Sequence, residues 1–346
     1  MRFAQLVKAH GRRYRHTVIA LDGVTHMASR ITSDVTIEYR SVLFDKRKGL
    51  ANLPLFRATL SAIAPDTLIT YNWGAIEWAL ANRFGKRRRH VHIEDGFGPE
   101  EADRQLLRRI WVRRLALSGR HTTIALPSRV LQKLALETWR LPASHVRYVP
   151  NGIDCERFWV DVASRSARSG PLVFGTLATL RKEKNLARLI TLFDAIAARV
   201  PQNSPRLLIV GDGPERAALE SLARRTSYSE QIQFAGGTQK PEEWYPQMDI
   251  FALTSDTEQM PFSVLEAMAA GLPVVSTAVG DVASLVSAPN APMIVNPADD
   301  DAYCRAATTL LGDRALRVEL GLANQRKAHQ EFDEKLMATR YSELFG

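Results

Sequence analysis

Short apolar runs that end in polar turns recur through the first half of the chain. The strand candidates are HTVIALDG (16–23), DTLITYNW (66–73), RHVHIEDG (89–96) and TTIALPS (122–128). Stretches with helical spacing separate them, at residues 52–64, 74–83, 101–118 and 128–138. Regular alternation of this kind predicts a parallel sheet with helices on both faces.

The pattern restarts after DVASRSARSG (161–170), whose composition is typical of a linker. The later strand candidates are PLVFGTL (171–177), RLLIVGDGP (206–214), IQFAGG (232–237), DIFALTS (249–255) and LPVVST (272–277). Helical stretches such as 185–200 and 214–225 separate these strands. A length of 346 residues favours about two domains. We therefore predict two doubly wound α/β domains in series, covering residues 1–165 and 166–325.

Composition narrows the class of protein. No apolar run approaches the about 20 residues that a membrane span requires, and no signal peptide opens the chain. The two cysteines, Cys155 and Cys304, lie far apart in sequence, which favours a reducing compartment and argues against structural zinc. We expect a cytoplasmic protein.

The charge of the chain is divided unevenly between its halves. Residues 1–170 hold 29 Lys/Arg and 15 Asp/Glu, a net charge of +14, whereas residues 171–346 hold 17 and 22, a net charge of −5. The first half should therefore attract anions. No nucleic-acid motif accompanies its basic clusters, so we expect no nucleic-acid partner.

One basic cluster has an apolar stripe beside it. It lies in RQLLRRIWVRRLAL (104–117), where Leu106, Leu107, Ile110, Trp111 and Leu115 accompany the arginines Arg108, Arg109, Arg113 and Arg114. This pattern suits an anionic membrane surface or an anionic acceptor. A solvated basic helix without any ligand is the simpler interpretation, and the sequence leaves it open.

Ligands of open parallel sheets bind at the carboxyl ends of the strands, so the chemistry should lie in the turns. In GDGP (211–214), Gly211 and Gly213 flank Asp212 and allow a ligand close to the backbone, with Pro214 at the expected start of a helix. A Gly-x-Gly alone is weak evidence, because a tight strand-to-helix turn needs the same residues.

Two cations stand in the turn RKEKN (181–185), immediately before a helix. Arg181 and Lys184 there oppose the helix dipole unless an anion binds between them and the helix N–H groups. A diphosphate would fit this place, and its developing charge would be stabilised there. A solvated loop with Glu183 as the local counter-charge is the competing interpretation.

Two glutamates frame a short apolar helix in TEQMPFSVLEAMAAGLPVVST (257–277). Glu258 precedes the helix and lies in the ligand-facing turn, where backbone N–H groups from about Met260 to Val264 would point at the ligand that Glu258 orients. Met260, Pro261, Phe262 and Ser263 are the candidates for donor binding beside it. Glu266 lies within the helix, where its carboxylate can accept two hydroxyls, as a ribose offers. A surface position for Glu266 is the alternative that spacing leaves open.

Other catalytic devices are poorly supported. The acidic run at 299–301 precedes a helix and is better explained by capping than by metal binding. His90 and His92 lie within a strand and lack zinc-ligand partners, so we interpret them as structural. We expect no metal.

Together these motifs resemble the retaining nucleotide-sugar glycosyltransferases of family 4, also called glycosyl transferases group 1. The resemblance is carried in order by VRYVPNGIDCERF (146–158), GTLATLRKEKNLARLI (175–190), LLIVGDGPERAALESLA (207–223), LEAMAAGLPVVST (265–277) and VGDVASLV (279–286). It implies the GT-B architecture, two Rossmann-like domains facing across a cleft, with residues 326–346 as a helix that crosses back to the first domain.

The resemblance also implies roles for the candidate residues. The second domain would bind a nucleotide-sugar donor, UDP- or GDP-linked, with Lys184 on the diphosphate, Glu258 on the sugar and Glu266 on the ribose. Transfer would proceed with retention, without metal or other cofactor, to a glycan or lipid-linked acceptor on the first domain. With such an acceptor the protein would lie peripherally on the inner face of the membrane.

Three departures from the family pattern matter. Thr179 stands where an arginine is usual, and Arg181 is the candidate substitute. The strand RHVHIEDG offers Glu94 and Asp95 in place of a histidine, and with Asn151 they are the acceptor-side candidates. The first strand and its glycine-rich loop are missing before RFAQLVKAH (2–10), so we expect either an upstream start or an impaired first domain.

These departures leave a second class of protein open, a sugar-nucleotide-binding protein of the same fold with impaired or lost transfer activity. Donor binding without product would distinguish it. Sugar-nucleotide epimerases share the architecture, but the motif set argues against them.

Overall fold

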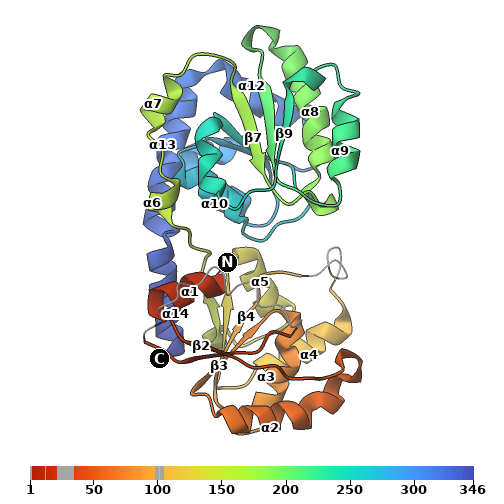
Figure 1. Cartoon of the computed structure of the whole chain (residues 1–346), viewed down its shortest axis with the longest axis vertical. Helices are drawn as coiled ribbons and strands as arrows, with labels where there is room; N and C mark the ends of the chain where they lie inside the picture. Colours follow the sequence, from red (N-terminus) through yellow and green to blue (C-terminus); the bar gives the residue numbers. More distant parts are fainter. Residues whose placement is uncertain (1, 12, 22–34, 98–100, 102–104) are drawn as a thin grey trace. The chain divides into compact units, whose positions relative to one another are not determined.

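A computed structural model of the chain describes residues 2–11, 13–21, 35–97, 101 and 105–346. It divides into two compact units (Figure 1). The first unit comprises Met1–Gly152 and Glu334–Gly346, and the second comprises Ile153–Asp333. These limits differ from the domain boundaries predicted at 165/166 and 325/326. Residues 153–166 join the second unit because Phe158 and Cys155 are buried in its core.

The second unit is built on a six-stranded parallel sheet with the order β12-β11-β10-β7-β8-β9. The strands are β7 (Val173–Leu177), β8 (Arg206–Val210), β9 (Ile232–Gly236), β10 (Ile250–Leu253), β11 (Val274–Thr277) and β12 (Ile294–Val295). Its α-helices are α6 (Cys155–Phe158), α7 (Val162–Ser166), α8 (Leu186–Arg199), α9 (Arg216–Ala223), α10 (Phe262–Ala269), α11 (Val282–Leu285), α12 (Asp300–Gly312) and α13 (Arg314–Glu331). Short 3-10 turns are η6 (Lys182–Lys184), η7 (Pro201–Asn203), η8 (Ser229–Gln231), η9 (Pro241–Glu243), η10 (Tyr245–Gln247) and η11 (Ala288–Met293).

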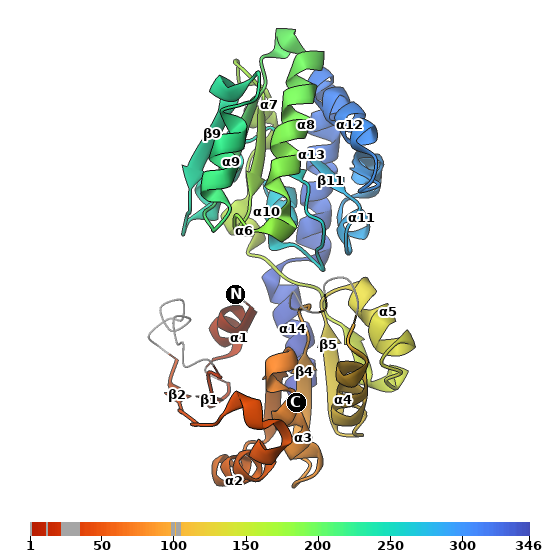
Figure 2. The same ribbon diagram turned by 90° about the vertical axis from the view of Figure 1, so that its right-hand side faces the viewer.

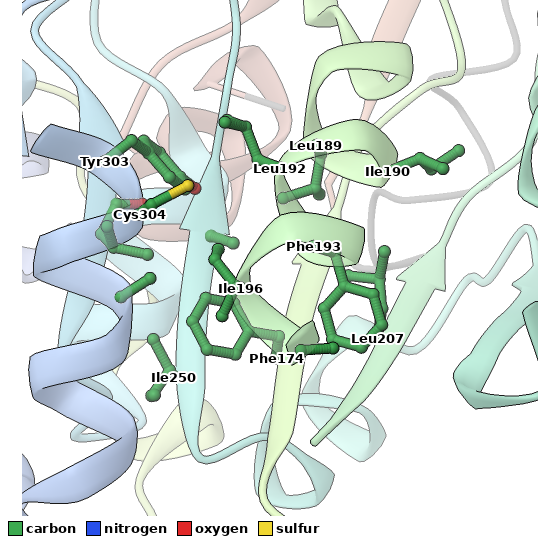
Figure 3. Close-up of a cluster of buried hydrophobic side chains, with 14 of the residues drawn as sticks. Phe174, Leu189, Ile190, Leu192, Phe193, Ile196, Leu207, Ile250, Tyr303 and Cys304 are labelled. Atoms are coloured by element: carbon green, nitrogen blue, oxygen red, sulfur yellow. The ribbon is translucent and has the colours of Figure 1, made fainter. Parts of the chain in front are cut away.

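Alternation along the strands assigns one core to each face of this sheet. In β8, Leu207 and Ile209 join the core beneath α8, α9 and α12, whereas Leu208 and Val210 join the core beneath α6, α10 and α11. Figure 3 shows the first of these cores, with Phe193 and Ile196 of α8 packed toward strand residues. Both faces are covered, so the polar ends of the strands are where a ligand can reach this unit.

The first unit contains a four-stranded parallel sheet with the order β3-β4-β5-β6. Its strands are β3 (Thr67–Tyr71), β4 (Arg89–Ile93), β5 (Thr122–Leu126) and β6 (Val146–Tyr148). Its helices are α1 (Arg2–His10), α2 (Leu53–Ile63), α3 (Ile76–Arg83), α4 (Leu107–Leu117), α5 (Arg129–Glu137) and α14 (Glu334–Phe345), with 3-10 turns η2 (Lys46–Asn52), η3 (Trp73–Ala75) and η5 (Ala143–His145). Helix α4 begins six residues later than the predicted 101.

Helices α1 and α14 lie side by side on one face of the four-stranded sheet (Figures 1 and 2). Leu6 of α1 and Met337 and Tyr341 of α14 share a core with Val91 and Ile93 of β4. Strands β1 (His16–Val18) and β2 (Ile37–Tyr39) form a separate parallel pair. Within the described residues, no strand joins this pair to β3. Strand β3 is therefore an edge strand, and its Ile69 is 36% exposed.

Candidate active site

The turns that follow β7 and β10 are tied together by hydrogen bonds. The Asp256 N–H donates to the Glu183 carbonyl at 2.9 Å, and Asn185 Nδ2 donates to Asp256 Oδ1 at 2.8 Å. Thr254 Oγ1 donates to the Asn185 carbonyl at 3.0 Å. Because β7 and β10 are neighbours in a parallel sheet, both turns leave from the same edge. The turn RKEKN (181–185) and the turn that contains Glu258, both predicted to carry chemistry, therefore lie together.

Lys184 and Glu258 form the centre of this site. Lys184 Nζ lies 2.6 Å from Glu258 Oε1, and Ser255 Oγ donates to the same oxygen at 2.8 Å. The Lys184 side chain is 25% exposed and that of Glu258 is 10% exposed, so the pair remains accessible. Arg181 is 62% exposed and lies 4.0 Å from Glu183, the counter-charge considered for this turn.

Glu266 is buried, which rules out the surface position considered for it. Its exposed fraction is 4%. The Tyr245 hydroxyl donates to Glu266 Oε2 at 2.7 Å and also lies 3.3 Å from the Ser263 carbonyl oxygen. Burial raises the pKa of Glu266 to about 7, although the Tyr245 hydrogen bond and the charge of Arg157 lower it. A buried carboxylate with a neutral partner retains lone pairs for further hydroxyls.

The two glycines of GDGP are required by the protein's own backbone. Gly211 has a φ of 148°, and a Cβ built there would lie 1.8 Å from the Ala178 carbonyl oxygen. A Cβ at Gly213 would lie 2.5 Å from the Leu180 carbonyl oxygen. The turn after β8 therefore packs directly on the turn after β7, with Asp212 between the glycines. Helix α9 begins at Arg216, so Pro214 precedes the helix instead of opening it.

Glu258 lies in the turn that leads into the amino end of α10. Pro261 precedes the helix in an extended conformation, and Phe262 is its first residue. The N–H groups of the first helical turn, including those of Phe262 and Ser263, have no partner within the helix by geometry. Met260 is buried at 4% exposure and anchors this turn in the core. The arrangement offers backbone donors beside the Lys184–Glu258 pair.

The acceptor-side candidates fall into two groups. Arg2 of α1 hydrogen-bonds both the Asp95 carboxylate and the Asn151 side-chain oxygen, so these two residues share a partner. Glu94 is fully buried instead, with His92 Nε2 at 3.3 Å and Arg113 Nε at 3.5 Å from its Oε2. The structure therefore brings Asp95 and Asn151 together and directs Glu94 into the interior.

Two of the four arginines in the basic cluster of 104–117 are directed to an internal carboxylate, so these two do not serve the anionic surface or acceptor that was one of the two interpretations. Arg113 is fully buried, with Nη2 at 2.9 Å from Glu101 Oε2, and Arg109 Nη1 lies 3.1 Å from the same oxygen. Burial alone would raise the pKa of Glu101, but Arg113 and Arg109 hold it below its usual value. An internal carboxylate has already neutralised these cations.

Sequence reasoning missed Tyr245, Arg2 and Glu101. The Trp-Tyr pair at 244–245 precedes a buried strand, where an aromatic residue is usually part of a core. No periodicity distinguishes an aromatic residue that packs from one whose hydroxyl supports a carboxylate. His90 and His92 are structural, as predicted, because Thr70 Oγ1 lies 2.8 Å from a ring nitrogen of each.

A cavity of about 630 Å³ lies in the second unit at the amino ends of the strands, opposite the Lys184–Glu258 pair. Its arginines already serve the fold. Arg165 hydrogen-bonds the carbonyls of Ala270 and Gly271, and Arg317 Nη1 donates to the Leu310 carbonyl at 2.6 Å. These groups lie at the C-terminal ends of α10 and α12, where cations are favourable. We therefore place the site at the Lys184–Glu258 pair, not in this cavity.

The described residues show neither a metal site nor a membrane span. Within the described part of the chain, no three His, Cys, Asp or Glu side chains are placed to hold a metal ion. Asp299 caps α12, with Oδ1 accepting from the Ala302 N–H at 2.8 Å, as the capping interpretation predicted. No helix of the described residues combines the length and apolar character that crossing a membrane requires.

Comparison with known families identifies the class. The model described as Glycosyltransferase Family 4 matches residues 2–157, and the model described as Glycosyl transferases group 1 matches residues 171–313. Together the two matches account for most of both units. The chain belongs to the group 1 glycosyltransferases, the family that its motifs resemble.

Curated relatives match part of the chain. It is 24% identical over 169 residues to N-acetyl-alpha-D-glucosaminyl L-malate synthase of Bacillus anthracis, a match covering 49% of this chain and 44% of the relative. It is 29% identical over 199 residues to GDP-mannose-dependent alpha-(1-6)-phosphatidylinositol monomannoside mannosyltransferase of Mycobacterium tuberculosis, covering 53% and 51%. The chain thus spans about half the length of the curated relatives it matches.

Solved structures match the whole chain in fold. A glycosyltransferase from Rickettsia africae is 15% identical with a TM-score of 0.79, covering 99% of this chain and 92% of that one. HepE of Anabaena in complex with UDP is 19% identical with a TM-score of 0.81, covering 99% and 94%. The fold is therefore GT-B, two α/β units with parallel sheets.

Proposed function

We propose that this protein is a retaining glycosyltransferase that moves a sugar from a nucleotide-diphosphate sugar to a glycan or lipid-linked acceptor without a metal ion. The observation that carries the proposal is the 2.6 Å contact of Lys184 with Glu258 at the carboxyl ends of β7 and β10. Buried Glu266, the candidate ribose ligand, follows eight residues after Glu258 on the adjoining helix. Family membership supplies the reaction class.

The site residues take distinct roles in this proposal. The Glu266 carboxylate accepts hydrogen bonds from the ribose hydroxyls, and Glu258 with the backbone of 260–263 holds the donor sugar. Lys184, assisted by Arg181, stabilises the negative charge on the departing diphosphate. The bond from the anomeric carbon to the diphosphate breaks as a bond to the acceptor oxygen forms on the same face, and the acceptor proton passes to a diphosphate oxygen.

The nature of the donor is supported by the names of related proteins. HepE was solved with UDP and with UDP-glucose, and the mycobacterial relative is named for GDP-mannose. A UDP- or GDP-sugar is therefore the first choice here. Since Lys184 and Arg181 supply positive charge beside the diphosphate position, a metal ion is not needed for that purpose.

A thermal-shift panel of UDP-, GDP-, ADP- and dTDP-sugars tests donor binding, because a ligand of the native state raises apparent stability. We expect one nucleotide class to stabilise the protein, with the effect lost in Glu266→Ala and unchanged by EDTA. Stabilisation by none of the four would contradict the proposal. Donor binding with no transfer to any acceptor would favour the alternative, a sugar-nucleotide-binding protein of this fold.

We also propose that α4 binds an anionic membrane surface, as a lipid-linked acceptor would require. Leu107, Trp111 and Leu115 recur at intervals of four along α4 and are 66%, 65% and 48% exposed. Arg108 is exposed beside them, and the Arg114 guanidinium lies 5.6 Å from the Trp111 ring centroid. An exposed apolar stripe flanked by arginines matches an interfacial helix.

Vesicle co-sedimentation tests this surface. We expect binding to vesicles containing phosphatidylglycerol, little binding to pure phosphatidylcholine, and a loss of binding in Trp111→Ala. The control variant must also change an exposed apolar side chain. Val130→Ala removes another exposed apolar side chain, from α5, and should leave binding unchanged. Equal sedimentation with both lipids would rule out this part of the proposal.

A further inference from the structure

A small cavity lies in the first unit at the carboxyl ends of β3 and β4. Its volume is about 370 Å³. Its lining includes Asn72, Trp73, Gly74, Asp95, Phe97 and Arg113. The volume is at the small end of the range for ligand pockets, about 300–1,000 Å³, and suits one ring better than an extended chain. We call it the ring pocket.

The buried guanidinium of Arg113 contacts the aromatic walls of the ring pocket, Trp73 and Phe97. The Arg113 guanidinium carbon lies 5.0 Å from the Trp73 ring centroid, 5.2 Å from that of Phe97 and 5.0 Å from that of Trp139. Arg113 is itself held by two hydrogen bonds to the Glu101 carboxylate. The indole of Trp73 and the ring of Phe97 are therefore oriented before any ligand arrives.

The polar side of the ring pocket is fixed by an unusual backbone conformation. Asn72 has a φ of 54° and a ψ of −177°, a backbone conformation that residues other than glycine rarely adopt. Its N–H donates to the Ile93 carbonyl at 2.8 Å, and its Oδ1 accepts from the Asp95 N–H at 2.7 Å. The Asp95 side chain stays 43% exposed. A carboxylate and an amide are thus held beside the aromatic walls.

The charges around the ring pocket cancel. Arg113 and Arg109 pair with the carboxylates of Glu101 and Glu94, and Arg2 pairs with Asp95. Among the described residues that surround the pocket, these pairs leave no net positive charge for an anion, and the most exposed of the paired groups is the carboxylate of Asp95. An anionic ligand would meet that carboxylate at close range, which disfavours it.

An uncharged sugar ring has the matching chemistry. One face of a pyranose presents C–H groups, which pack on an aromatic ring, while its edge presents hydroxyls that donate to a carboxylate or an amide oxygen. We propose that the ring pocket binds one uncharged pyranose unit of the acceptor, stacked on Trp73 with hydroxyls on Asp95. The assignment to the acceptor rests on the proposed function; the binding itself does not.

Saturation-transfer NMR on the full chain, without any donor, tests the binding directly. The probes are methyl α-D-glucopyranoside, methyl α-D-mannopyranoside and the anionic methyl α-D-glucuronide, each at about 10 mM because one weakly held ring should have a millimolar Kd. We expect saturation transfer to at least one uncharged probe, and a severalfold weaker signal for the glucuronide.

A matched pair of variants controls for folding. A Cβ at Gly74 meets no atom within 4 Å, so Gly74→Ala and the larger Gly74→Leu should both fold. We expect Gly74→Ala to keep the signal and Gly74→Leu to lose most of it. Trp73→Phe, which retains an aromatic ring, should weaken the signal, whereas Trp159→Ala, at an exposed position of the second unit, should not change it.

The outcomes separate this inference from the proposed function. No transfer to either uncharged probe, an equal signal in Gly74→Leu, or a stronger signal for the glucuronide would each overturn the ring pocket while leaving donor binding intact. Failure of the donor panel beside a positive sugar signal would overturn the transferase proposal alone. A signal confined to the uncharged probes and blocked in Gly74→Leu supports the ring pocket.

Discussion

The two units bury carboxylates in opposite ways. In the first unit, Glu101 and Glu94 lie in the core beside Arg113, and the pKa of Glu101 stays below its usual value. In the second unit, Glu266 is buried against the neutral hydroxyl of Tyr245, and burial raises its pKa to about 7. A carboxylate that is paired with a cation inside the protein is already neutralised and stabilises the fold. A carboxylate whose partner is a neutral hydroxyl can still accept hydrogen bonds from a ligand.

The largest effect should come from removing the cation of the first unit. Arg113→Met leaves Glu101 and Glu94 buried without a counter-charge, and breaking a buried pair in this way costs about 3–5 kcal/mol. Urea unfolding of the variant measures the loss. Arg108→Ala, at an exposed position on the same helix, should change stability by no more than about 0.5 kcal/mol. Similar losses in the two variants would contradict the comparison.

The charged pair of the second unit should matter for turnover more than for stability. Lys184→Ala should reduce kcat/KM by about 10²–10³-fold, because a preorganised charge beside the leaving group is lost. The unfolding midpoint should change little, since Lys184 is 25% exposed. Steady-state kinetics with the donor found in the panel provide the measurement. Lys182→Ala, two residues away in the same turn, is the control and should stay within about twofold of the parent.

Stability should depend on pH through Glu266. Its folded-state pKa of about 7 exceeds the usual 4.5, so the folded protein retains a proton that the unfolded chain loses between these values. Stability therefore falls as pH rises from 4.5 to 7, by about 3 kcal/mol for this group. Glu266→Gln removes that dependence, and its unfolding free energy relative to the parent should increase with pH. Parallel curves from pH 4.5 to 8 would contradict this assignment.

Tyr245→Phe removes only the hydroxyl partner of Glu266. The hydrogen bond lowers the pKa of Glu266, so the variant's pKa should rise further above 7. If ionised Glu266 binds the ribose, donor KM at pH 7 should increase by about fivefold to tenfold and recover at higher pH, with kcat nearly unchanged. A loss of kcat at all pH values, with KM constant, would show a different role for Tyr245.

Much of the fold was predictable because both units repeat a local pattern. Runs such as RLLIVGDGP and DIFALTS are short, apolar and closed by polar turns, and each became a buried strand with its turn at the carboxyl end. The residue limits of the units differ from the predicted boundaries at 165/166 and 325/326. The linker was predicted at 161–170, but Phe158 and Arg165 attach the segment from 153 to 166 to the second unit through packing and hydrogen bonds.

The candidate site was likewise predictable from the sequence only in part. Lys184 and Glu258 were found because turns after neighbouring parallel strands must lie together. The sequence did not predict which charged side chains are buried, because no spacing distinguishes Arg113, which is fully buried, from Arg114 beside it. Glu94 and Asp95 are adjacent in sequence, yet one faces the core and the other remains exposed, because successive positions alternate at the end of a strand.

The sequence by itself determined two parallel α/β units, the family, and the turns that carry the candidate chemistry, since all three follow from local periodicity and ordered motifs. Only the tertiary structure decided which charges are already neutralised, which carboxylate has a neutral partner, and where an aromatic ring pocket forms. These properties depend on residues such as Glu101 and Arg113, or Tyr245 and Glu266, that are distant along the chain and meet only after folding.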